Sequence, residues 1–120
     1  MAQILALGLD PACVDPKEFS GFSPEQVRAF IESQLERVRA AGYEVVSCYL
    51  DLGETAEAVT ARVLNSRAFD CVMIGAGLRA AAQLVLFEKL INLVHAQAPG
   101  ARLCFNSSPG DTLDAVRRWV

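Results

Sequence analysis

The sequence has no long apolar run, no excess of basic residues and a single histidine, and these shortages exclude several classes of function. No uninterrupted apolar stretch reaches the roughly 20 residues that a membrane-spanning helix needs. The chain has 11 Lys and Arg residues against 14 Asp and Glu residues, a formal net charge of −3, whereas nucleic-acid-binding domains carry a basic face. We therefore expect neither a membrane nor a nucleic acid as a partner.

Cysteine is also sparse and unpatterned. The 4 cysteines lie far apart without a Cys-x-x-Cys pair, and three of them fall in strand-like runs, where a thiol serves as a small apolar side chain. This distribution favours a reducing compartment over a disulfide framework. The first residues have no charged leader or cleavage pattern, so we expect a cytoplasmic protein. No set of His, Cys and carboxylate residues has metal-ligand spacing, so we expect no metal site, and the sequence identifies no cofactor.

The pattern of apolar residues predicts four strand-then-helix units in one domain, residues 1–120. Ser23, Pro24 and Gln26 form a typical helix start, with Ser23 as the cap and Pro24 at the first helical position. The expected strands are residues 4–9, 43–50, 69–74 and 101–105, and the expected helices are residues 24–41, 54–66, 78–98 and a last helix that begins after Ser108.

Strands that alternate with helices form a parallel sheet with right-handed crossovers. The strand at 69–74 is continuously apolar after Asp70, which is typical of a strand covered on both faces. We therefore expect a three-layer α/β fold with the flavodoxin-like strand order 2-1-3-4. The first and last helices would then cover one face, and the second and third helices the other.

Most polar residues outside the helices directly follow strands, and in a parallel sheet these positions meet at one edge. The connections at the opposite edge are short, so loop length and polarity both predict a ligand-binding crevice at the C-terminal ends of the strands. The expected ligand-binding residues are Asp10, Gly75, Gly77, Arg79, Asn106, Ser107 and Ser108, with Cys13 and Asp51 as secondary candidates.

Arg79 follows the Gly75–Gly77 turn and falls in the first turn of the helix expected at 78–98. A cation is disfavoured there by about 0.3–1 kcal/mol, because the helix dipole places positive charge at that end. A phosphate or carboxylate bound by Arg79 and the nearby amides would reverse this penalty. A salt bridge from Arg79 to Asp10 or Asp51 would explain the same residue without a ligand.

Residues 75–80 also match the relaxed dinucleotide-binding pattern G-x-G-x-x-G/A. The motif follows the third strand rather than the first, and the next strand ends at Phe105 and Asn106 without an acidic residue to hold a ribose. A dinucleotide site is therefore the less favoured alternative.

The helix expected at 78–98 is apolar over about half of its circumference on a helical wheel. One face of a sheet covers less than that, so Leu86, Leu90 and Leu93 must contact either the second helix or another subunit. We expect a homodimer through this helix.

The segment 69–119 resembles a family of small uncharacterised bacterial proteins with a Rossmann-like or flavodoxin-like fold. The resemblance lies in residues 74–79, in Leu86, Phe87 and Glu88, in His95, and in residues 105–109. It implies the fold and the crevice, but no reaction.

Two functions of different kinds follow from these observations. The first is a ligand-binding protein or enzyme that acts on a small molecule bearing a phosphate or carboxylate. The second is a non-catalytic homodimeric interaction domain without a ligand. No catalytic residue can be assigned, because no nucleophile has a general base beside it in the sequence.

Overall fold

The strands of the chain pair in parallel, in the order β2-β1-β3-β4. The computed structural model describes the backbone of residues 1–120 and every side chain except that of Pro16. The described residues form a sheet of β1 (Gln3–Leu9), β2 (Glu44–Leu50), β3 (Cys71–Ile74) and β4 (Arg102–Phe105). The predicted α/β class and strand order are confirmed.

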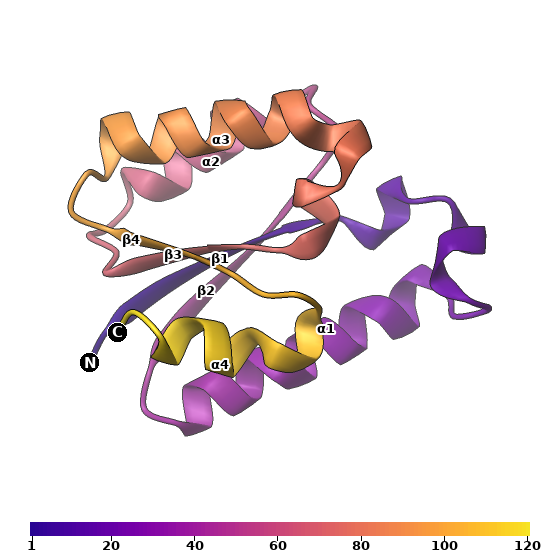
Figure 1. Cartoon of the computed structure of the whole chain (residues 1–120), viewed down its shortest axis with the longest axis horizontal. Helices are drawn as coiled ribbons and strands as arrows, with labels where there is room; N and C mark the ends of the chain where they lie inside the picture. The colour runs from indigo at the N-terminus through magenta and orange to yellow at the C-terminus, as the bar shows by residue number, and fades with distance from the viewer.

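Two layers of helices enclose this sheet (Figure 1). The helices α1 (Pro24–Ala40) and α4 (Thr112–Arg117) cover one face, and α2 (Ala56–Leu64) and α3 (Leu84–Gln97) cover the other. The start of α1 is capped as predicted, since Ser23 and Gln26 exchange side chain–backbone hydrogen bonds. Within the described part of the chain, none of the helices has the length and apolar content needed to cross a membrane.

Alternation along the strands divides the core into two clusters. On β1, Leu5 and Leu7 pack under α2 and α3, whereas Ile4 and Ala6 face α1 and α4. All of β3 is buried, because both of its faces are covered. Each face of the sheet therefore has its own apolar core, and the two can be considered separately.

The expected helix at 78–98 is wrong at its start. Two 3₁₀ turns, Ala76–Arg79 and Ala81–Gln83, precede α3, and Ala80 between them is extended with φ −64° and ψ 150°. Leu78 is fully buried, and Arg79 donates to the carbonyl of Ile74, so the first turn is held against the end of β3. Arg79 therefore does not lie in the first turn of a long helix, and the dipole argument does not apply to it.

The apolar arc of α3 is largely covered within the single chain. Leu86 is 7% exposed and Leu90 is 0% exposed, and both belong to the core formed with α2 and the sheet. Leu93 packs against the same core, and Lys89 forms an ion pair with Glu57 of α2 at 3.4 Å. A second subunit is therefore not needed to cover the apolar side of α3. The homodimer stays a prediction, but the observation on which it was based no longer supports it.

Candidate ligand-binding site

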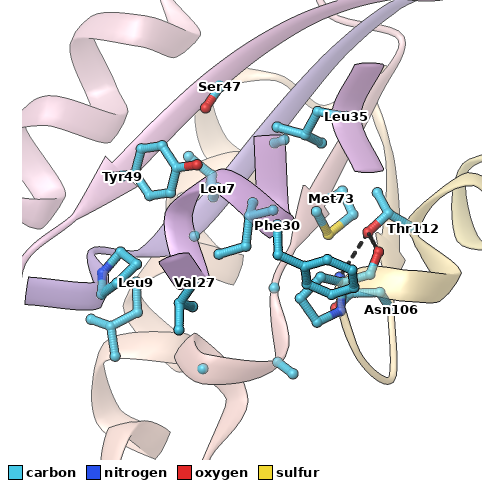
Figure 2. Close-up of a pocket in the computed structure, with 18 of the residues that line it drawn as sticks. Leu7, Leu9, Val27, Phe30, Leu35, Ser47, Tyr49, Met73, Asn106 and Thr112 are labelled. Atoms are coloured by element: carbon cyan, nitrogen blue, oxygen red, sulfur yellow. Dashed lines mark hydrogen bonds between the residues drawn. The ribbon is translucent and has the colours of Figure 1, made fainter. Parts of the chain in front are cut away.

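A cavity of 340 Å³ lies between α1 and the C-terminal half of the sheet. The strands β1, β2 and β3 supply its floor, and the residues around the start of α4 and the loop after β1 contribute to its sides. In Figure 2, Ser47 and Tyr49 of β2 lie on one side, and Met73, Asn106 and Thr112 lie on the other. The cavity is at the edge of the sheet where the sequence predicts a crevice, on the face that α1 and α4 cover.

Small residues on the floor explain why this part of the sheet is hollow. Ala6 pairs with Ser47 in the register, which places two small side chains next to each other, and Gly8 beside Tyr49 contributes no side chain at all. A Cβ atom built on Gly8 would meet only the Tyr49 ring, at 3.9 Å. The side chains on this part of the sheet therefore leave the space under α1 unfilled. At the other end of the same face, Ile4 and Val38 fill it.

The wall opposite the floor is a stripe of apolar side chains on α1. Val27, Phe30 and Ile31 line the cavity, and Phe19 from the loop after β1 adds a second aromatic ring. The Phe30 side chain is 50% exposed, although it borders an apolar space. Phe19 lines the cavity, whereas Phe22 is exposed.

The two glycines of the Gly75–Gly77 turn fit closely against β1. A Cβ atom on Gly75 would lie 3.3 Å from the carbonyl oxygen of Leu7, and one on Gly77 would lie 3.3 Å from Cβ of Leu9. The amide of Gly75 also donates to the Leu7 carbonyl at 2.9 Å. Both glycines line the cavity, but packing against β1 is enough to explain their lack of side chains.

Arg79 is engaged by the protein. Its Nε donates to the Ile74 carbonyl at 3.0 Å, and one terminal nitrogen donates to Oδ1 of Asn106 at 3.2 Å. The guanidinium also lies 5.3 Å from the centre of the Phe105 ring. Burial lowers the pKa of Arg79, and the nearby Asp111 carboxylate acts in the opposite direction.

The alternative salt bridge from Arg79 to Asp10 or Asp51 is not formed. Asp10 accepts a hydrogen bond from Arg28 instead, at 2.8 Å, and also caps the turn after β1 through the Ala12 amide. Asp51 accepts from the amides of Gly53 and Thr55 and from the Thr55 hydroxyl, which lowers the pKa of this carboxylate. Each carboxylate therefore has a local structural role.

Asn106 connects the cavity to its surroundings. The side chain is 5% exposed and lines the cavity, its Nδ2 donates to the Thr112 hydroxyl at 3.0 Å, and its Oδ1 accepts from Arg79. The next two residues, Ser107 and Ser108, do not line the cavity, and their amides donate to the Asp111 carboxylate. Ser107 and Ser108 are thus used to start the last helical segment.

Cys13 lies in the 3₁₀ turn after β1 and is partly exposed. Desolvation raises the pKa of the Cys13 thiol, and the carboxylates of Asp10, Asp51 and Glu54 raise it further. A raised pKa opposes thiolate formation, so nothing in its surroundings activates Cys13 as a nucleophile.

A polar network at the β2 side of the cavity was not predicted from the sequence. The hydroxyls of Ser47 and Tyr49 both donate to Oε2 of Glu32 on α1. Arg28, one turn earlier, lies over the Tyr49 ring at 4.1 Å from its centre. Arg28 and Glu32 are four residues apart on a helix, and Ser47 and Tyr49 are two apart on a strand, so periodicity places each pair on one face.

Burial and the hydrogen bond to Glu32 raise the pKa of Tyr49 to about 12. The phenol therefore keeps its proton at neutral pH and remains the donor to Glu32.

Comparison with known proteins assigns no family to the chain. No protein-family model matches it, and a search of curated proteins gives no match. The resemblance to small bacterial proteins therefore stays a prediction. Among the described side chains, no three His, Cys, Asp or Glu residues are grouped so that they could hold a metal ion. The chemistry of the site must be argued from the cavity itself.

Proposed function

We propose that this chain binds a small, largely apolar molecule in the cavity at the C-terminal ends of its strands. The observation that carries the proposal is the hollow of 340 Å³, whose floor is lowered by Ala6 and Gly8 and whose opposite wall is the apolar stripe of α1. Small-molecule sites typically measure about 300–1,000 Å³ and are lined by apolar side chains with a few polar groups. A core that needed only stability would be packed without such a space.

The anionic group predicted from the sequence is compatible with this proposal when it is attached to an apolar body. The Gly75–Gly77 turn and Asn106 line one end of the cavity, so a carboxylate or phosphate there would lie beside groups that already bond to Leu7, Arg79 and Thr112, and the apolar body would supply most of the affinity. A free inorganic anion is less well supported, because Arg79, Ser107 and Ser108 all bond to protein groups. Neither a reaction nor a dinucleotide is needed to account for the site.

Binding of 8-anilinonaphthalene-1-sulfonate tests the proposal, since this dye joins an aromatic body to an anion and fluoresces when desolvated. We expect saturable binding to the wild-type chain. Gly8→Val should weaken it by about tenfold or more, equivalent to about 1.4 kcal/mol, because the new side chain occupies the floor of the cavity. Gly100→Val is the matched control, since a Cβ atom on Gly100 meets nothing within 4 Å and this residue lies outside the cavity.

Competition experiments distinguish the contributions of the apolar body and of the anionic group to binding. Decanoate should displace the dye, whereas inorganic phosphate should not if the apolar body dominates. Absence of saturable binding to the wild-type chain, or equal binding by the Gly8→Val and Gly100→Val variants, would contradict the proposed site.

A further inference from the structure

Two hydroxyl groups on β2 determine whether one wall of the cavity offers hydrogen-bond donors or acceptors to a ligand. Ser47 and Tyr49 both line it, and each donates its hydroxyl proton to the same oxygen of Glu32, Ser47 at 2.9 Å. An ionised carboxylate can only accept hydrogen bonds, and a hydroxyl has a single proton. The two hydroxyl oxygens therefore have only lone pairs left to offer to a molecule in the cavity.

The surrounding charges keep the hydroxyls in this orientation. Arg28 stacks on the Tyr49 ring and forms its ion pair with Asp10 rather than with Glu32. Glu32 forms no ion pair within the described part of the chain, which leaves the two hydroxyls as its hydrogen-bond donors. The raised pKa of Tyr49 agrees with a phenol that stays protonated. A donor from a ligand would extend this chain of hydrogen bonds and strengthen it.

Resting on the proposed function, we infer that the ligand carries a hydrogen-bond donor, a hydroxyl or an amine, on its apolar body, and that this group binds at Ser47 and Tyr49. Glu32 is a positioning residue, because it acts through the two hydroxyls. A ligand with only acceptor groups at this end would place its own lone pairs against those of the two partly buried hydroxyls, and it would bind less tightly.

A pair of matched probes tests this inference. The compounds 2-naphthol and 2-methoxynaphthalene share the aromatic body, but only the first has a donor. Calorimetric titration of the full chain should show naphthol binding more tightly by about two- to tenfold, the range expected for one hydrogen bond. The ratio of the dissociation constants of 2-methoxynaphthalene and 2-naphthol should fall towards one in Tyr49→Phe. It should fall further in Tyr49→Phe combined with Ser47→Ala.

Tyr43→Phe is the matched control, because Tyr43 packs on the same face of the sheet but does not line the cavity. This variant should keep the preference for naphthol. Preference for naphthol that persists in the double variant would overturn the inference, and so would a preference for the methyl ether in the wild-type chain.

The design separates the two proposals. If both naphthalenes bind the wild-type chain equally and Gly8→Val weakens both, the cavity is a ligand site without the inferred donor preference. If neither naphthalene binds and Gly8→Val has no effect on dye binding, the proposed function fails together with the inference.

Discussion

At the scale of single residues, the glycines around the cavity have different reasons to be glycine. Gly75 has little room for a side chain, since its Cβ would lie 3.3 Å from the backbone oxygen of Leu7 in a central strand. Gly8 has room, since its Cβ would meet only the Tyr49 ring at 3.9 Å. Neither residue has a positive φ, so an alanine would be accepted by the local backbone conformation.

Gly75→Ala and Gly8→Ala should therefore differ in stability. The first forces apart two hydrogen-bonded strands, and we expect it to lower the free energy of unfolding by about 1–3 kcal/mol, as overpacking does. The second should change it by less than about 1 kcal/mol, because the methyl group enters the cavity and the unfolded chain becomes less flexible. Urea denaturation measures the free energy of unfolding of both variants. Equal losses of stability would show that the cavity has no space for a side chain at Gly8.

The individual site residues were predictable only in part. Gly75, Gly77 and Asn106 line the cavity because they follow strand ends, a feature visible in the sequence. Ser47 and Tyr49 were missed because their place opposite Ala6 and Gly8 depends on strand register, which the sequence does not specify. The hydrogen-bond partners of Arg79 likewise depend on where the turn after β3 packs.

At the scale of elements, an arginine side chain bonds to each edge strand of the sheet, one from α1 and one from the residue that directly follows α4. In a parallel sheet, alternate residues of an edge strand direct their backbone groups outwards. On β2 the outward carbonyl of Val45 accepts from Arg39 of α1 at 3.0 Å, and on β4 that of Phe105 accepts from Arg118 at 2.8 Å. These side chains place a cation at each edge, which opposes pairing with another chain.

Arg118→Ala should therefore promote self-association, because it exposes the Phe105 carbonyl at the β4 edge. Arg117→Ala changes the net charge equally at the neighbouring position and is the control. Static light scattering during mild heating should rise earlier for Arg118→Ala than for Arg117→Ala. Identical scattering curves would mean that Arg118 does not protect the edge.

Element boundaries were predicted best where capping residues mark them. Ser23, Pro24 and Gln26 placed the start of α1 at the residue where the structure has it. The start of α3 was placed six residues too early, because the apolar character of residues 78–83 is as typical of a helix as of the 3₁₀ turns that form there. Burial of Leu78 at the end of β3 is a tertiary effect that local pattern cannot reveal.

At the scale of the whole molecule, the two faces of the sheet are packed differently. The α2 and α3 face has large side chains along its length, including Leu5, Leu7 and Ile74. On the other face α4 is only 6 residues long, and small residues of β1 lie under α1. The fold and the order of strands could be predicted from alternation of strands and helices, but this asymmetry depends on the register of three strands.

The most direct test of the central claim, that the cavity between α1 and the sheet binds a small apolar molecule, is an amide chemical-shift titration of the ¹⁵N-labelled chain with 2-naphthol. Gly8, Gly75 and Gly77 line the cavity, whereas Gly42, Gly53 and Gly100 do not, so glycine amides report on the site and on the rest of the chain in one spectrum. We predict saturable shifts in the first three glycines and almost none in the other three. Shifts of equal size in both groups, or none at saturating probe, would contradict the account.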